Sequence, residues 1–596
     1  MTVYNAPTKD MRFILNDVLQ ISKYSNLPGF SEASEDLVDA ILEEGAKMAG
    51  NVLHPINAAG DKEGCTRHED GSVTTPTGFK EAYDTFREGG WQALSFDPDY
   101  GGQGLPYILS VVMNEMVSSA NMAFGIYPGL AMGAALAIHA HATDEIKQKY
   151  LPKMVSGEWG GTMNLTEPHC GTVLGLLRTK AAPQDDGSYK ISGTKIFISA
   201  GEHDLTDNII HLVLARIEGG PEGVKGISLF VVPKFHVNDD GSLGERNGAV
   251  CGSVEEKMGI HGNSTCVMNY DEATGYLVGE EHKGLKAMFT MMNEARLGVG
   301  LQGLAISEVA YQNGAAYAKD RVQGRALTGA AEPEKPADPI IVHPDVRRML
   351  MDQRAFTEGG RAWMYWTALH ADLHFKAEDE ETRTKADDYM GLMTPVLKAY
   401  LTDKGYAHAT NAQQVLGGHG YIQEWGMDQF VRDARIAMIY EGANGVQALD
   451  LVGRKLMKDG GRAWQAFFKE VDEFVSDNQD SDELKPYLDG LTSAKKDVEE
   501  ATQWLAANAM QNFNHAGAGS NDYLYMWALL CLGFGWAQMA KIAIEKKAAG
   551  ETDDFFANKL TTGAYFLERL LPDTKMHLGK VTAGADAMMA LPAEAF

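Results

Sequence analysis

A single carboxylate stands where an apolar and aromatic run meets a turn. Glu441 follows Met438, Ile439 and Tyr440 and precedes Gly442. A carboxylate in this setting can be held away from bulk water, which raises its pKa as a general base requires. A lone acid is otherwise an exposed loop residue, so the assignment depends on the rest of the chain.

Three short segments carry groups suited to binding a polar ligand. "NLTEPHCGT" (residues 164–172) and "KIFISAGE" (195–202) lie among β-rich runs, and "QVLGGHGY" (414–421) lies among helical ones. Hydroxyls and backbone N–H groups can stabilise charge on a ring or a phosphate, and glycines permit close backbone approach. Polar turns and core aromatics are the simpler explanation for each segment alone.

Two arginines, Arg296 and Arg321, are 25 positions apart in a region with helical spacing. On one helix they would share a face but lie roughly 37 Å apart, so one ligand could not contact both. Between them, "GVGLQG" (298–303) matches the GxGxxG dinucleotide fingerprint. That fingerprint requires a strand before it and a helix after it, whereas both flanks here are helical. We therefore expect these glycines to serve helix packing.

The elements that would position these groups fall into segregated layers. Helical spacing dominates both ends of the chain, and short β-rich runs punctuated by Gly, Asp and Pro fill the middle. The predicted fold class is α+β. The predicted domains are an N-terminal helical domain with an extra N-terminal segment (1–160), a β-barrel or sheet domain (161–283), a four-helix-type domain carrying Glu441 (284–458) and an additional C-terminal helical domain (459–596).

Composition narrows the class of protein. The 596 residues are 44% hydrophobic and 22% charged, as in a globular protein with several packed units. The net charge of -28, without a dense Lys/Arg run, argues against nucleic acid or anionic lipid as a partner. Five scattered cysteines lack zinc spacing. These features predict reduced thiols, a cytoplasmic location and no metal. The N-terminal residues are charged where a signal peptide would need an apolar core, so no signal peptide is predicted.

Two uncharged runs need an explanation other than a membrane span. Residues 116–138 are long enough, but they are interrupted by Ser118, Ser119, Asn121, Gly125, Pro128 and Gly129. Pro128 with its flanking glycine is expected to break the run into two buried helices. Residues 523–537 suit a helix buried in a bundle or at a subunit interface. We predict no membrane span, and the second run suggests that residues 459–596 cover a subunit surface.

In order and spacing, "NLTEPHCGT", "KIFISAGE", "QVLGGHGY" and "YEGANGVQ" resemble the acyl-CoA dehydrogenase family of flavoproteins, and the resemblance covers most of the chain. It implies FAD as cofactor. It also implies that Glu441 removes the α-proton of an acyl-CoA thioester while the β-hydrogen leaves as hydride to flavin N5. Some relatives place the base on the long helix at the position of Ala295. Glu294 is one residue away from that position, so Glu441 is favoured.

The resemblance also assigns cofactor residues. Leu165 and Thr166 are implied to hydrogen-bond the polar edge of the flavin, and Gly171 and Thr172 to lie near its phosphates. Phe197 is implied to stand beside the isoalloxazine.

A further group is implied to serve the FAD of a neighbouring subunit: Arg321, Gln414, Gly417 and Gly418. A guanidinium fork suits a pyrophosphate, and glycines permit close approach. Because these residues would contact the FAD of another subunit, the expected assembly is a homodimer or a higher homo-oligomer. Ser199, in contrast, is implied to bond the N5 side of the chain's own flavin.

The substrate pocket is implied to include Arg296, Tyr440 and Gly442. The full-length pattern is most similar to a long bacterial branch acting on 3-(methylthio)propanoyl-CoA in dimethylsulfoniopropionate breakdown, with electron-transfer flavoprotein as acceptor. Short- or long-chain acyl groups remain alternatives, as does an acyl-CoA oxidase that uses oxygen. From other classes, a non-catalytic flavin-binding scaffold, a nucleic-acid-binding relative and a colourless helical structural protein remain.

The chain departs from the family pattern at four positions. Val173 stands where Asp is usual, and Gly324 where an aromatic is common. Ala443 and Gly445 replace the Thr and Gln that many relatives use to contact FAD. These changes leave Glu441 and the flavin-side motifs in place.

Overall fold

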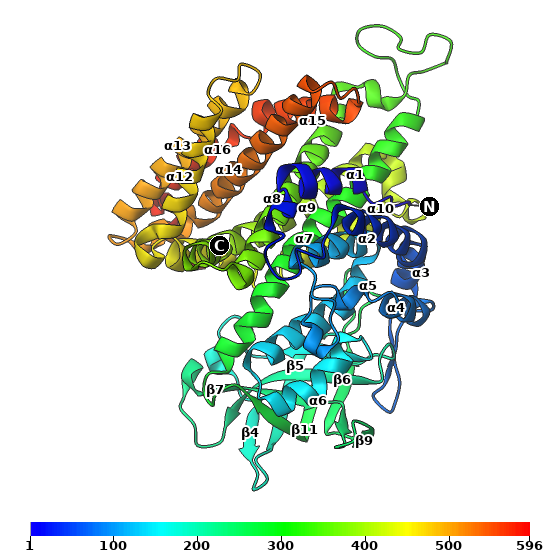
Figure 1. Cartoon of the computed structure of the whole chain (residues 1–596), viewed down its shortest axis with the longest axis vertical. Coiled ribbons are helices and arrows are strands. Elements are labelled where there is room, and N and C mark those ends of the chain that lie inside the picture. Colours follow the sequence, from blue (N-terminus) through cyan, green and yellow to red (C-terminus); the bar gives the residue numbers. More distant parts are fainter. Residues whose placement is uncertain (1) are drawn as a thin grey trace. The chain divides into compact units, whose positions relative to one another are not determined.

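Two units make up the chain in this computed structural model, which describes residues 2–596. One unit is Glu44–Gly298, and the other is Met1–Glu43 with Val299–Phe596. Helices α2 (Glu35–Lys47) and α7 (Gly284–Asp320) each run across a boundary between the units. The first unit contains the sheet, and the second is built of helices (Figure 1). The predicted α+β class with segregated layers is confirmed.

The sheet of the first unit closes on itself. Strand β11 pairs with β5, β5 with β4, β4 with β6, β6 with β7, and β7 with β11 again, while β3 and β10 add to β6 and β11. The predicted β-barrel is therefore present. The strands are β3 (Trp159–Asn164), β4 (Lys180–Pro183), β5 (Tyr189–Ser199), β6 (Asn208–Ile217), β7 (Ile227–Pro233), β10 (Ala249–Val254) and β11 (Thr265–Val278), with short pairs β1 (Thr66–Arg67), β2 (Val73–Thr74) and β8 (Phe235–Val237), β9 (Leu243–Arg246).

Strand β6 is apolar on both faces because both faces are buried. Ile210, Leu212 and Leu214 point into one core cluster, which also contains residues of helices α5 (Tyr107–His141) and α6 (Asp144–Val155). Val213 and Ala215 point into the other cluster, formed by barrel strands. Successive strand side chains alternate between faces, so burial on both sides gives a continuous apolar run. The remaining helices of this unit are α3 (His54–Glu63) and α4 (Phe79–Glu88).

Helix α5 contains the longer apolar run, and its break is not where the sequence suggested. Pro128 lies inside the helix, whereas Asn121 has non-helical angles (φ −158°, ψ 89°). The Asn121 side chain accepts from Phe124 N at 3.0 Å and donates to Leu53 O at 3.4 Å. It thus caps the second half of α5 from within the helix. The prediction of a break at Pro128 was wrong. The helix continues through Pro128 and is interrupted at Asn121, whose side chain supplies the capping hydrogen bond.

Two helices are long and apolar enough to cross a membrane by length and composition, α5 and α14 (Phe513–Ala548). In the structure, 67% and 78% of their apolar windows are buried. Such burial is typical of core helices. In α14 this burial covers the run 523–537, which confirms the prediction of a helix buried in a bundle. The run therefore gives no reason to expect that residues 459–596 cover a subunit surface.

In the second unit, helices α8 and α9 lie against each other, and α14 contacts α8, α9, α11, α13, α15 and α16. The C-terminal extension is therefore packed onto α8, α9 and α11, and α11 begins three residues after Glu441 (Figure 1). The bounds are α1 (Thr8–Arg12), α8 (Pro344–Lys376), α9 (Glu380–Val415), α10 (Met427–Ala437), α11 (Asn444–Asp450), α12 (Arg462–Asp477), α13 (Lys485–Asn508), α15 (Asp554–Arg569), α16 (Asp573–Thr582) and α17 (Asp586–Met589).

The "GVGLQG" segment lies inside α7 and packs on a helix, as expected. A Cβ on Gly303 would come within 2.3 Å of the Leu401 carbonyl oxygen in α9. A Cβ on Gly405 would lie 2.3 Å from the Gly303 carbonyl oxygen. The two glycines allow α7 and α9 to touch through their backbones.

A buried ion cluster joins distant segments of this unit. Arg361 of α8 pairs with Asp10 of α1 and, at 2.8 Å, with Glu308 of α7. Lys559 of α15 pairs with Asp10 and, at 2.7 Å, with Glu358 of α8. Arg361 and Lys559 are each 1% exposed in their side chains. Because a buried charge without a partner is costly, these bonds tie the N-terminal segment and the C-terminal extension to the central helices.

Replacing Arg361 tests this cluster. Arg361→Met is expected to lower the free energy of unfolding of this unit by about 3–5 kcal/mol, because Glu308 loses its arginine partner and Asp10 loses one of its two cations. Lys485→Ala breaks an exposed pair with Asp489 and should cost no more than about 0.5 kcal/mol. Urea unfolding followed by tryptophan fluorescence compares the three proteins. Equal midpoints for Arg361→Met and wild type would contradict the assigned role.

Candidate active site

The 164–172 loop is attached to strand β5 in the barrel unit. The pairs Lys195 with Met268 and Ile198 with Cys266 leave two residues of β5 opposite one of β11, which is a β-bulge. The bulge turns Ile196 N toward the loop, where it donates to Thr166 O at 2.9 Å. Irregular pairing at this point is therefore what brings the two predicted flavin-side motifs together.

A buried ion pair lies beneath the same loop. Lys195 is 0% exposed, and its Nζ donates to Leu165 O at 3.0 Å and to Glu167 Oε1 at 2.9 Å. Glu167 also accepts from Thr179 Oγ1 at 2.6 Å and from Arg178 N at 2.8 Å. Burial lowers the pKa of Lys195 to about 8, although Glu167 opposes this shift. Both residues occur in the quoted motifs, but the sequence offered no signal that they pair.

Phe197 occupies a conformation that few bulky residues adopt. Its φ is +59°, in the left-handed region, and its side chain is 61% exposed. For an L-residue this conformation costs roughly 1–2 kcal/mol. Strain of this kind concentrates at functional sites, where the surroundings impose it. The bulge thus presents an apolar ring at the surface of this unit, with Ser199 half-buried two residues further on.

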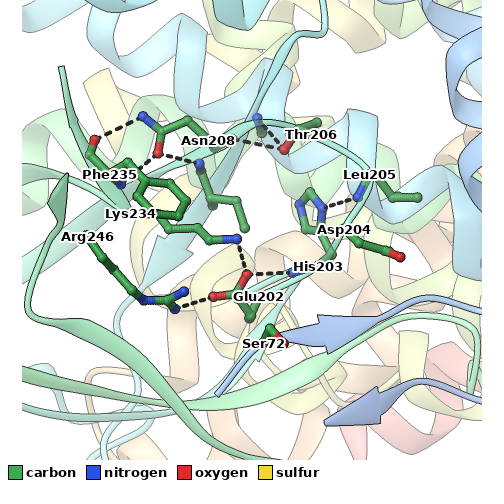
Figure 2. Close-up of polar contacts among 12 residues, drawn as sticks. Ser72, Glu202, His203, Asp204, Leu205, Thr206, Asn208, Lys234, Phe235 and Arg246 are labelled. Carbon is green, nitrogen blue, oxygen red and sulfur yellow. Dashed lines mark hydrogen bonds and ion pairs between the residues drawn. The ribbon is translucent and has the colours of Figure 1, made fainter. Parts of the chain in front are cut away.

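The chain leaving β5 is fixed by polar contacts (Figure 2). Glu202 is 1% exposed and pairs with Lys234 and, at 2.6 Å, with Arg246. Asn208 donates to Phe235 O at 3.0 Å and accepts from Phe235 N at 2.9 Å. These contacts join the turn after β5 to β8 and β9. They restrain the segment that follows Phe197 and Ser199.

In the helical unit, Glu441 lies between α10 and α11. Its φ is +57°, and that of Gly442 is +86°, so two successive residues are left-handed. Gln447 Nε2 donates to Glu441 O at 3.2 Å and to Gly442 O at 3.1 Å. Lys398 Nζ, on a residue that is 0% exposed, donates to Gly442 O at 2.8 Å. The backbone around Glu441 is held from two sides, while its side chain is half-buried.

Tyr440 is fixed beside Glu441. Its hydroxyl donates to Gln302 Oε1 of α7, and burial raises the pKa of Tyr440 well above its ordinary value. The side chain therefore remains a neutral phenol. Of the three predicted substrate residues, this unit brings Tyr440 and Gly442 together.

Arg296 lies on α7 within the other unit. Two residues earlier, Glu294 accepts a hydrogen bond from Tyr107 OH at 2.5 Å. Burial raises the pKa of Glu294 to about 7, with Tyr107 opposing the shift. A carboxyl group with a raised pKa thus lies two residues from Arg296, on the barrel unit. Its pairing with Tyr107 could not be read from the sequence.

The residues predicted to serve a neighbouring subunit gather near the end of α7. Arg321 is exposed and directly follows this helix. Tyr317 OH hydrogen-bonds His419 Nδ1 at 2.9 Å, which brings the glycine turn to that end. A Cβ on Gly417 or Gly418 would meet no atom within 4 Å. Together with exposed Gln414, these positions form an open surface of arginine, amide and glycine.

The departures from the family pattern have different settings. Gly324 has φ +72°, so an aromatic residue there would be strained. Val173 and Ala443 are exposed, and a Cβ on Gly445 would meet no atom within 4 Å. Only the change at Gly324 has a structural reason in the backbone of this chain.

Family models match four successive parts of the chain. The acyl-CoA dehydrogenase N-terminal domain matches residues 42–158, the middle domain 162–273 and the C-terminal domain 282–457. The chain belongs to the acyl-CoA dehydrogenase family. A further model, "Acetyl-CoA dehydrogenase C-terminal like", matches residues 467–592. The chain is an FAD-dependent oxidoreductase that acts on the CH–CH group of acyl-CoA thioesters.

Whole-chain relatives support the same class. The 3-methylmercaptopropionyl-CoA dehydrogenase of Ruegeria pomeroyi is 42% identical, over 98% of this chain and 99% of its own. The broad-specificity linear acyl-CoA dehydrogenase FadE5 of Mycobacterium tuberculosis is 35% identical, over 96% of each chain. Among solved structures, Caenorhabditis elegans ACDH-11 in complex with C11-CoA has a TM-score of 0.80 at 17% identity, covering 98% of this chain and 95% of its own. This likeness shows that the fold extends through the C-terminal extension.

The residues on the barrel surface fit FAD. An exposed aromatic ring suits the face of a flavin, and the hydroxyls of Thr166 and Thr172 suit its polar groups. Gly171 is open, since a Cβ there would meet only Thr166 Cγ2, at 3.9 Å. Phe197 is the distinctive element of this set because it keeps a large apolar side chain exposed at a cost in backbone energy.

The cost at Phe197 leads to a prediction. Phe197→Gly is expected to weaken FAD binding by about tenfold or more through loss of the ring contact. The same change should raise the stability of the apoprotein by up to about 1 kcal/mol, because glycine adopts this φ without a steric penalty. Thermal unfolding of apoprotein and FAD titration measure the two effects.

Glu272→Gly is the matched control. Glu272 is exposed, lies on β11 of the same barrel and has φ +49°. This variant should gain stability in the same way and keep wild-type FAD affinity. Unchanged FAD binding in Phe197→Gly would contradict a flavin contact for Phe197.

Proposed function

We propose that Glu441 is the catalytic base of this dehydrogenase and that the substrate is 3-(methylthio)propanoyl-CoA, oxidised to its 2-enoyl thioester. The observation that carries the first part is the backbone at Glu441. Two consecutive left-handed residues are clamped by Lys398 and Gln447, while the carboxylate stays half-buried. The chain adopts an unfavourable backbone conformation at Glu441, and this conformation fixes the direction of the side chain. A general base must be positioned in this way.

In this proposal the Glu441 carboxylate accepts the α-proton of the thioester. Bound FAD supplies the acceptor for the β-hydride. Tyr440 and Gly442 flank the base, and Arg296 contributes to the substrate pocket. Because the Glu441 carbonyl is held by Gln447, the carboxylate can approach the substrate without movement of its own backbone.

The proposed cofactor contacts follow the flavin-side segments and the glycine turn. The chain's own FAD would be held by Leu165, Thr166, Gly171, Thr172, Phe197 and Ser199. A neighbour's FAD would be held by Arg321, Gln414, Gly417 and Gly418. We also propose the four domains 1–160, 161–283, 284–458 and 459–596, which the ranges matched by the four family models support.

Identity over the whole chain supports the sulfur-containing substrate. The Ruegeria relative named for it is 42% identical, against 35% for the mycobacterial relative named for linear acyl-CoA. The second relative keeps straight-chain thioesters as the alternative substrate class. Electron-transfer flavoprotein is the proposed acceptor, and a reduced cytoplasmic setting agrees with five unbridged cysteines.

We propose a homodimer or a higher homo-oligomer. Beside the glycine turn, Tyr421 is 85% exposed, Ile422 51% and Trp425 38%. Apolar and aromatic exposure of this extent is typical of surfaces that bind another chain. Its position next to Arg321 and Gln414 supports an interface at which one subunit contacts the FAD of the other.

The base is tested by Glu441→Gln. This variant should bind FAD and thioester as the wild type does, because the amide keeps the shape of the side chain. Flavin reduction should slow by at least about three orders of magnitude, because the amide cannot accept the α-proton. Anaerobic stopped-flow absorbance measures the rate. Glu500→Gln, which changes an exposed acid on α13, is the control, and reduction by Glu441→Gln at the wild-type rate would refute the assignment.

The substrate is tested by anaerobic mixing with three thioesters. 3-(Methylthio)propanoyl-CoA should bleach the flavin at lower concentration and faster than butanoyl-CoA or palmitoyl-CoA. Faster bleaching by a straight-chain thioester would retain the enzyme class and reject the sulfur substrate. Stoichiometric hydrogen peroxide under air would identify an oxidase in place of the proposed acceptor.

A further inference from the structure

The C-terminal extension reaches the loop of Glu441 through a chain of hydrogen bonds. Tyr525 OH, on α14, donates to Asp403 Oδ2 at 2.9 Å. Asp403 Oδ1 accepts from Asn444 Nδ2 at 2.6 Å. Asn444 Oδ1 accepts from Lys398 Nζ at 2.8 Å, and the same Nζ donates to Gly442 O at 2.8 Å. A residue more than eighty positions beyond Glu441 is thus linked to the backbone beside it.

Two members of this link, Lys398 and Asn444, are buried. Lys398 is 0% exposed and Asn444 is 8% exposed. The Asn444 amide also donates to Thr402 Oγ1 at 2.9 Å and Ala399 O at 3.1 Å. The Asp403 carboxylate supplies the negative charge of this network, whose cation is Lys398. In such a connected network the loss of one partner changes the orientation of the others.

Tyr525 is itself fixed in place. Its ring meets Tyr400 edge-on at a centroid distance of 5.0 Å, and Lys404 Nζ lies 5.5 Å from its centroid. Burial, reinforced by Asp403, raises the pKa of Tyr525 well above its ordinary value. The hydroxyl therefore stays protonated and donates to the carboxylate. Its ring contacts do not depend on that hydroxyl, so the two contributions can be separated.

We infer that Tyr525 is a positioning residue for the active site, acting through Asp403 and Asn444 on the backbone of Glu441 and Gly442. This inference rests on the proposed role of Glu441. The loop is strained at Glu441, whose φ is +57°, and its conformation is held by hydrogen bonds to the carbonyls of Glu441 and Gly442. When Tyr525 OH is removed, Asp403 loses a donor and can turn away from Asn444, and the loop relaxes. Small displacements of a catalytic group have large effects on rate.

The test is Tyr525→Phe, which keeps the ring and removes the hydroxyl. At saturating 3-(methylthio)propanoyl-CoA, or butanoyl-CoA if that reduces the flavin faster, the limiting rate of flavin reduction should fall by about five- to tenfold. The half-saturating thioester concentration and the FAD content should stay within about twofold of wild type. A merely structural role would lower FAD content and stability without this separation of rate from binding.

Tyr523→Phe is the matched control. Tyr523 is a buried tyrosine two residues away on the same helix, and its hydroxyl hydrogen-bonds Thr502 Oγ1 at 2.7 Å, within the extension. Its loss removes a comparable hydrogen bond that does not lead to Glu441. The limiting rate of Tyr523→Phe should equal that of the wild type, and an equal fall in both variants would overturn the inference.

A second variant keeps the test decisive if Tyr525→Phe folds poorly. Asp403→Asn should lower the limiting rate in the same way, and adding Tyr525→Phe to it should lower the rate little further, because both act on one chain of bonds. Full additivity, or a wild-type rate in Tyr525→Phe, would overturn the inference. Glu441→Gln run in parallel separates the two claims. If that variant is inactive while Tyr525→Phe is normal, only the inference fails, whereas an active Glu441→Gln removes the proposed base itself.

Discussion

Two lysines with no exposed surface hold the segments that carry the proposed cofactor and base residues. Lys195 donates to Leu165 O in the barrel unit, and Lys398 donates to Gly442 O in the helical unit. A desolvated ammonium group must have all its partners supplied by the protein. Because those partners include backbone carbonyls, satisfying the charge also fixes the path of the chain. The left-handed residues Phe197 and Glu441 each lie close in sequence to a segment fixed in this way.

Strain at these positions requires rigidity elsewhere. In the barrel unit, the contacts of Lys195 and Glu202 restrain the chain before and after Phe197. In the helical unit, the buried cluster of Asp10, Arg361 and Lys559 joins segments from both ends of the chain to α8. Neither device touches a reacting group. They supply stability that offsets the unfavourable backbone conformations of Phe197 and Glu441, each in its own unit.

Periodicity predicted the layers, because alternation and apolar runs report burial directly. The two-sided burial of β6 explains its continuous apolar sequence, and helical flanks were sufficient to reject "GVGLQG". The break in α5 was misplaced because Asn121 caps a helix from its interior, a tertiary choice that Pro128 does not reveal. The pairs Glu167–Lys195 and Asn444–Asp403 were not foreseen, since their members are far apart in sequence and ordinary in type. The individual site roles taken from the family remain predictions.

The C-terminal extension illustrates how a polar contact can matter more than an apolar one. The apolar run 523–537 fills the space between α14 and its neighbours, and this burial accounts for its composition without any further role. Tyr525, within that run, is the exception because its hydroxyl points to Asp403. Apolar packing is tolerant of substitution if volume is kept, whereas a charged network demands one geometry. The Tyr525 hydroxyl is linked through Asp403, Asn444 and Lys398 to the carbonyl of Gly442, directly beside Glu441, so it is the contact through which the extension would act on the chemistry.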